Sequence, residues 1–135
     1  MARPASTQPT DGELAILKAL WSSGPAPLGQ VCATLRRQRP VATTTVATML
    51  QVMLAKGLVK RSRGDRGYLW SAKVSQEAAA SRLVNKVLDH VFDGSAQRLV
   101  AHLLDDGKLS ERDRQEIRRL LAADKARPSN QGRRS

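Results

Sequence analysis

Residues 43–55 contain no charge, and at helical spacing they put small and hydrogen-bonding side chains on one face and apolar ones on the other. In the major groove of DNA, which is about 12 Å wide and admits one α-helix, each base pair presents a distinct pattern of donors, acceptors and methyl groups. Gln51 can form two hydrogen bonds with adenine, and alanine or threonine methyl groups can pack against thymine methyls. We therefore interpret one face of a helix in this stretch as a base-reading surface that consists of Thr44, Thr45, Ala47, Thr48 and Gln51.

Basic residues on both sides of this stretch favour an anionic partner. Threonine and glutamine are also common on ordinary helix surfaces, so the interpretation depends on the surrounding charge. The formal net charge is +11, and residues 1–75 contain 11 Lys and Arg residues but only 3 Asp and Glu residues. Any one of these cations alone is more often a solvated charge, but as a cluster they predict phosphate binding that weakens steeply with salt. The candidate phosphate contacts are Thr43, Arg36, Arg37, Arg39, Lys60, Arg61, Arg63 and Arg66.

Three helices are expected to position these groups. Residues 10–13 have the form of a capping box at the start of a helix over residues 11–22. A second helix is expected to begin near the proline at position 27, which fits its first turn, and to end before the proline at position 40. The third helix begins at the threonine cluster 43–45, one of which caps it, and ends at Gly57 in a left-handed turn.

A β-hairpin is expected to follow the third helix. Residues 58–63 and 67–72 have the character of short strands, and the glycine-rich residues 64–67 between them have turn chemistry. Three helices followed by a basic hairpin is the order of a winged helix-turn-helix. The predicted fold class is therefore mainly α with a small β wing, followed by a helical dimerisation region. Cys32 is expected to be a small buried hydrophobe in the core.

The C-terminal half is expected to form helices over residues 76–92, 95–105 and 110–122 with apolar stripes. These helices are too short and too few to bury their own stripes. Pairing with a second copy would cover them and would match a palindromic operator, although folding back onto the same chain's winged helix is the alternative. The predicted dimer interface consists of Leu83, Val84, Val87, Leu88, Val91, Leu99, Val100, Leu103, Leu104, Ile117, Leu120 and Leu121.

These patterns divide the chain into four parts. Residues 1–9 are expected to be a disordered lead, and residues 10–74 a winged-helix DNA-binding domain. Residues 75–123 are expected to be a helical dimerisation domain, and residues 124–135 a disordered basic tail.

Several classes of function are disfavoured by the composition. The single cysteine, Cys32, excludes a disulfide framework and a multi-cysteine metal site, and no run of about 18 apolar residues predicts a membrane span. His90 and His102 lie in different predicted helices, and no nucleophile–base pair or phosphate-binding glycine-rich loop is present. We therefore expect a cytoplasmic protein that is not an enzyme and uses no metal or cofactor.

The residues also match a known family. The chain resembles the penicillinase-repressor family, the bacterial winged-helix regulators that include repressors of β-lactamase and methicillin-resistance genes. The resemblance covers residues 10–122. Its matching stretches are ELAILKALW at 13–21, TTVATML at 44–50, KGLV at 56–59, FDGS at 92–95, Leu99-Val100 and Leu109-Ser110.

This resemblance implies a homodimeric repressor on a dyad operator. It further implies that a membrane sensor with a metalloprotease domain detects an antibiotic, after which the repressor is cleaved in its dimerisation region. By position, the cleavage falls at Ala101, His102 and Leu103, and this chain has His102-Leu103 where the best-known members have Asn-Phe, so its cleavage site departs from theirs. Related copper-responsive repressors carry C-terminal cysteines, which this chain lacks, so copper sensing is not expected.

The predicted reading helix also departs from the family. The best-known members carry basic residues where this chain has Thr44, Ala47 and Val52, so a different operator sequence is expected. We expect Val52 to be structural rather than exposed.

Two other classes of function compete with a repressor. A sequence-independent nucleic-acid-packaging protein would explain the charge but not the uncharged reading face. A winged-helix protein-interaction module would not touch DNA. A binding titration against random genomic fragments distinguishes them, since packaging gives uniform coating and the interaction module gives no retention at low salt.

Overall fold

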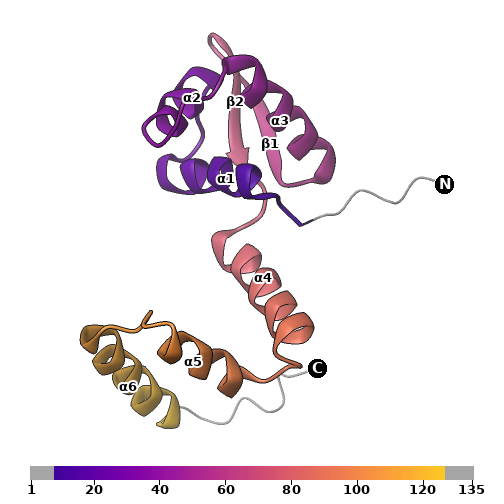
Figure 1. Cartoon of the computed structure of the whole chain (residues 1–135). Coiled ribbons are helices and arrows are strands. Elements are labelled where there is room, and N and C mark those ends of the chain that lie inside the picture. Colours follow the sequence, from indigo (N-terminus) through magenta and orange to yellow (C-terminus); the bar gives the residue numbers. More distant parts are fainter. Residues whose placement is uncertain (1–7, 127–135) are drawn as a thin grey trace, which may run out of the picture. The chain divides into compact units, whose positions relative to one another are not determined.

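The computed structural model describes residues 8–126 (Figure 1). The helices and strands are α1 (Asp11–Ser23), α2 (Leu28–Arg36), α3 (Thr43–Lys56), β1 (Val59–Gly64), β2 (Gly67–Ala72), α4 (Gln76–Val91), α5 (Ala96–Asp105) and α6 (Glu111–Lys125). This order confirms the predicted fold class, mainly helical with a small antiparallel wing. The chain forms two compact units, one up to Lys86 and one from Val87 onward, and the boundary between them in the sequence lies within α4.

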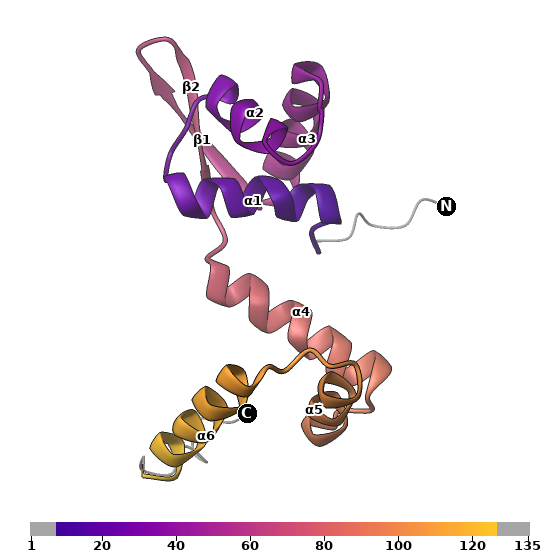
Figure 2. The ribbon, with the colours of Figure 1, turned by 60° about the vertical axis from the view of Figure 1, so that its left-hand side comes forward.

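The core of the first unit lies where α1, α2 and α3 gather around the base of the hairpin (Figures 1 and 2). The apolar spacing along each helix places one face inward, and aliphatic side chains dominate the interior. Cys32 is buried among them, as predicted. The largest fully buried members are Ile16, Leu17, Val31, Cys32, Val46, Leu50, Met53 and Val59.

The turn between α2 and α3 is held by a side chain rather than by a threonine cap. The N-cap of α3 is Ala42, which makes no side-chain hydrogen bond, so the predicted threonine cap is wrong. Instead, Arg36 Nη2 donates to Thr43 Oγ1 at 2.7 Å, and Arg36 Nε donates to the Val41 carbonyl at 2.9 Å. At the other end of α3, Gly57 has a φ of 80°, the left-handed turn expected of a helix C-terminus.

The hairpin is attached to the helices through its second strand. β1 and β2 pair antiparallel, from Val59 opposite Ala72 to Gly64 opposite Gly67. On the other edge of β2, Trp70 and Ala26 exchange two backbone hydrogen bonds of 2.8 and 2.9 Å. The position of the wing is therefore fixed to the α1–α2 connection.

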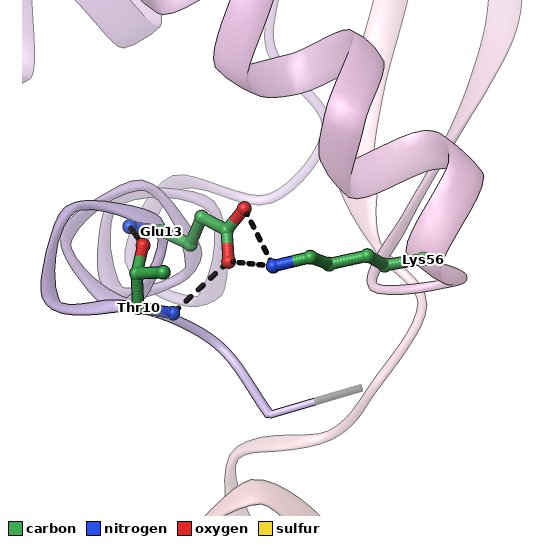
Figure 3. Close-up of polar contacts among 3 residues, drawn as sticks. All are labelled: Thr10, Glu13 and Lys56. Carbon is green, nitrogen blue, oxygen red and sulfur yellow. Dashed lines mark hydrogen bonds and ion pairs between the residues drawn. The ribbon is translucent and has the colours of Figure 1, made fainter. Parts of the chain in front are cut away.

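A buried carboxylate joins the start of α1 to the end of α3 (Figure 3). Thr10 and Glu13 form the predicted capping box, in which the Thr10 amide donates to Glu13 Oε1 at 3.0 Å and the Glu13 amide donates to Thr10 Oγ1 at 3.2 Å. Lys56 Nζ donates to both carboxylate oxygens of Glu13, at 2.8 and 3.1 Å. Glu13 is only 4% exposed, and these partners satisfy its charge away from water.

The second unit has well-defined helix starts but no buried side chain between Val87 and residue 126. Ser95 caps α5, and Ser110 with Asp113 forms a capping box on α6. The helix α6 continues to Lys125, so the tail predicted from residue 124 begins too early. Alanine is the best helix former, and the two alanines at 122 and 123 extend the helix beyond the last apolar residue. The rest of that tail, and residues 1–7 of the predicted lead, lie outside the described residues.

Substituting Glu13 tests the link between α1 and α3. The Glu13→Gln variant leaves the Lys56 ammonium half-buried without its counter-charge, so the free energy of unfolding should fall by about 1–3 kcal/mol. Urea unfolding followed by tryptophan fluorescence measures this, since both tryptophans, Trp21 and Trp70, lie in the first unit. The control is Glu116→Gln, whose carboxylate pairs with Arg119 on an exposed face and should show no measurable change. Equal effects of the two variants would contradict the link.

The same pair predicts a pH dependence of stability. Burial acts to raise the pKa of Glu13, but hydrogen bonds from Lys56 and from the Thr10 amide outweigh it, so the pKa lies below the ordinary 4.5. A carboxyl whose pKa is lowered by folding contributes stability that is present above its unfolded pKa and lost as the pH falls through the folded pKa. The stability difference between wild type and Glu13→Gln should therefore be constant above about pH 6 and shrink below 4.5. A difference that stays constant to pH 3 would contradict the lowered pKa.

Candidate nucleic-acid interface

The helix α3 has one buried side and one exposed side. Val46, Leu50 and Met53 face the core, and the five predicted base-reading side chains lie away from it. Four of these five are exposed and one, Ala47, is half-buried. The structure thus brings these candidates, Thr44, Thr45, Ala47, Thr48 and Gln51, to the solvent side of one helix.

Val52 also lies on the exposed part of α3. Its exposed fraction is 44%, so the expectation that it is structural is wrong. It follows Thr48 by one helical turn, which puts it next to the candidate base-reading face rather than on the core side.

The basic side chains around α3 carry charge that is not neutralised. Within residues 8–126, none of the seven predicted basic phosphate contacts forms an ion pair with a carboxylate. Arg37 and Arg39 are exposed just after α2, while Arg36 is also engaged with Val41 and Thr43. Arg36 therefore holds the turn into α3 in addition to presenting its charge beside it.

The wing places its basic residues on two different faces. Opposite residues of an antiparallel pair share a face, and successive residues alternate between faces. Arg61 lies opposite Trp70 and Arg63 opposite Tyr68, whereas Lys60 lies opposite Ser71 on the other face. The guanidinium carbon of Arg61 is 4.2 Å from the centre of the Tyr68 ring.

A hollow of about 360 Å³ lies between the wing, α3 and the start of α2. Ala47 and Gln51 line it from α3, and Arg66, Tyr68 and Trp70 line it from the wing. The structure thus brings two predicted base-reading residues and one predicted phosphate contact around one space. The other predicted contacts do not line this hollow: the basic residues Arg36, Arg37, Arg39, Lys60, Arg61 and Arg63, and the four exposed threonines of α3.

Tyr68 and Trp70 were not among the residues singled out from the sequence. The turn could have predicted their position. A two-residue loop at 65–66 between the paired glycines 64 and 67 determines which residues of the two strands lie opposite one another. That register alone places both aromatic rings on the face that carries Arg61 and Arg63.

The predicted dimer residues lie on α4, α5 and α6, and they are at least partly exposed. Leu83, Leu88, Leu99 and Leu103 are half-buried. The rest expose large apolar side chains, up to 61% for Val91 and 65% for Leu121. These remaining members are Val84, Val87, Val91, Val100, Leu104, Ile117, Leu120 and Leu121.

The predicted cleavage region lies inside a helix. Ala101, His102 and Leu103 belong to α5, and the first two are exposed. His102 Nε2 lies 3.1 Å from Asp106 Oδ2, and its ring is 5.7 Å from the ring of Phe92. His90 is exposed on α4. In the described part of the chain, histidine, cysteine and acidic side chains nowhere gather in threes as a metal site requires, and no helix there can cross a membrane.

Most of the chain matches one known protein family. Residues 9–123 match the family described as "Penicillinase repressor". The "Transcriptional regulator BlaI" of Mycobacterium tuberculosis is 32% identical over 114 residues, which are 83% of this chain and 81% of that protein. The "Penicillinase repressor" of Bacillus licheniformis is 21% identical over 120 residues, 89% of this chain and 94% of that protein.

Among solved structures, the chain is similar to monomeric BlaI of Bacillus licheniformis in complex with the blaP half-operator. The TM-score is 0.47 with 21% identity, over 53% of this chain and 87% of that one. The named sequence relatives are transcriptional regulators rather than enzymes. On the extent of the family match and the identity to its members, the chain belongs to the penicillinase-repressor family.

Proposed function

We propose that this protein is a sequence-specific DNA-binding repressor that acts as a homodimer on a dyad operator. The observation that carries the proposal is the uncharged, solvent-facing side of α3, which lies between basic residues of the α2–α3 turn and of the wing. Within residues 8–126 these basic residues form no ion pair with a carboxylate. Such a surface can read base edges with Thr44, Thr45, Ala47, Thr48 and Gln51 while the cations hold phosphates. A named relative, BlaI of Bacillus licheniformis, was solved on a half-operator, which supports the same partner here.

The second copy is proposed to bind through α4–α6. Large apolar side chains on these helices remain exposed in the single chain, and the second unit buries none of its described side chains. Covering apolar surface contributes roughly 25 cal/mol per Å², so a partner that buries these stripes stabilises the helices and itself. A symmetric dimer would present two copies of α3 to the two halves of a palindromic site.

Release from DNA is proposed to follow proteolytic cleavage near Ala101, His102 and Leu103, in response to an antibiotic or cell-envelope signal. The support is membership of a family whose named members include penicillinase repressors. A membrane sensor with a metalloprotease domain would be the partner, acting on a cytoplasmic repressor. Because these residues lie within α5, the helix must open locally before a protease can bind the backbone in an extended form. Cleavage there would remove α6 from the dimer.

The proposed function is tested by a binding titration of the full chain against random genomic fragments, followed by sequencing of what is retained. A repressor should retain a small set of fragments that share a dyad motif, with protection of both halves. Uniform coating of all fragments would indicate a packaging protein, and no retention at low salt would indicate a protein-interaction module. Either outcome would overturn the proposal.

Gln51 is predicted to discriminate between bases. Replacing it by alanine should lower the preference at one position of each half-site by about 1–3 kcal/mol, because the bidentate contact to a base edge is lost. The measurement is a competition assay with the retained DNA and single-base variants of it. The matched control is Gln97→Ala on α5, another exposed glutamine, which should keep the wild-type preference. An unchanged motif for Gln51→Ala would refute its role.

Val91 is predicted to lie in the dimer interface. Because its side chain is 61% exposed in the single chain, Val91→Asp should fold normally but bury an unpaired carboxylate on dimerisation. We expect the dissociation constant of the dimer to rise about 100-fold, which corresponds to about 3 kcal/mol. Sedimentation equilibrium measures it, and Val52→Asp is the control, since Val52 is a similarly exposed valine in the first unit. If Val91→Asp sediments as wild type does, the interface lies elsewhere.

A further inference from the structure

One face of the wing combines arginine and aromatic side chains. Arg61, Arg63, Tyr68 and Trp70 share this face because they occupy alternate cross-strand pairs, with the Ser62–Leu69 pair between them on the opposite face. The guanidinium carbon of Arg61 lies 4.2 Å from the centre of the Tyr68 ring and 5.6 Å from that of Trp70, and Arg63 lies 5.8 Å from the Tyr68 ring. Tyr68 is therefore the ring that both arginines share. We name these four residues the aromatic face.

The opposite face of the wing has a different character. Lys60 lies opposite Ser71, and Ser62 opposite Leu69. None of the recorded cation–aromatic contacts within residues 8–126 involves Lys60. The wing thus carries one exposed ammonium on one face and, on the other, two guanidinium groups that lie 4.2 and 5.8 Å from the centre of the Tyr68 ring.

The two rings of the aromatic face lie beside the base-reading side of α3, whereas Arg61 and Arg63 do not line the space between them. Tyr68 and Trp70 line the same hollow as Ala47 and Gln51, and Arg66 lines it near the hairpin tip. The two backbone bonds between Ala26 and Trp70 fix β2 in this position. A DNA strand whose bases contact Gln51 would therefore run beside the aromatic face.

Stacking changes how an arginine can bind a phosphate. A guanidinium that lies over a ring keeps its in-plane N–H groups available and is weakly hydrated. Its side chain is also restricted before the ligand arrives, so less rotamer entropy is lost on binding. Tyr68 is 42% exposed, and a ring that exposed is not needed to fill the core.

We infer that Tyr68 is a positioning residue that holds Arg61 against one sugar–phosphate strand of duplex DNA, which runs along the wing beside the hollow that Tyr68 lines with Gln51. This inference deepens the proposed function and rests on it. Arg61 contacts the backbone directly, and Tyr68 acts through Arg61. Lys60, on the opposite face, does not take part in this contact.

The test is a set of variants measured on the DNA that the wild-type chain retains, over a range of salt concentrations. Arg61→Ala should weaken binding about 10-fold and reduce the salt slope by about 0.9, the loss of one phosphate contact. Tyr68→Leu should weaken binding about 3-fold with an unchanged slope, because Arg61 still reaches the phosphate but is no longer held. Tyr68→Phe keeps the ring and should bind as wild type does.

The double variants separate positioning from a general effect on the wing. In Arg61→Ala/Tyr68→Leu, the loss should be no greater than in Arg61→Ala alone, because the two residues act as one unit. In Lys60→Ala/Tyr68→Leu, the two losses should add. A circular dichroism spectrum and a urea midpoint equal to wild type show that the leucine variant has kept its fold.

Two results would overturn the inference while leaving the proposed function intact. These are additive losses for Arg61→Ala and Tyr68→Leu, or a Tyr68→Phe variant as weak as Tyr68→Leu. A leucine variant that has lost its fold would show that Tyr68 is a structural residue, and this too would overturn the inference. If the wild-type chain retains no DNA at all, the proposed function itself fails, and the inference fails with it.

Discussion

The hydrogen bonds of Glu13 to Thr10 and Lys56 help to determine the orientation of α3 in the first unit. The Glu13 carboxylate closes the N-terminus of α1 through Thr10 and holds Lys56 at the last turn of α3, so both helix ends depend on one buried charge. The inner side of α3 packs on the core, and the Ala26–Trp70 bonds hold the wing next to it. Arg36 holds the first residue of α3, and with its last turn and inner side also fixed, the exposed side of α3 has one orientation relative to the wing, as a rigid reading surface requires.

The two units differ in how they are stabilised. The first has a core of twelve buried apolar residues, whereas the second buries no described side chain from Val87 to residue 126. Helices of this length are marginal in water without tertiary packing. In the proposed function, the second copy supplies that packing, so dimerisation and the order of α5 and α6 are coupled. A cut in α5 would then lower the affinity for DNA without touching the reading surface.

Features set by local rules could be predicted from the sequence, and features set by distant residues could not. The capping boxes at Thr10 and Ser110 and the left-handed Gly57 follow from short-range chemistry, and the structure has all three. The Glu13–Lys56 pair joins residues 43 positions apart, and the spacing of residues along each helix does not predict which distant side chains will pair. Arg36, expected only as a phosphate contact, also holds the turn where a threonine cap was expected. The exposure of Val52 could not be predicted either, because an aliphatic side chain at the edge of a helix's apolar stripe can be buried or exposed.

The central claim is that the exposed side of α3 contacts DNA together with the aromatic face of the wing. Amide chemical shifts of the isotope-labelled full chain, recorded while the retained DNA is added, test it most directly. Shifts should change for residues 43–51 and for the wing, and they should change little for α1, whose apolar residues face the core. Changes confined to α4–α6, with α3 and the wing unaffected, would contradict the claim.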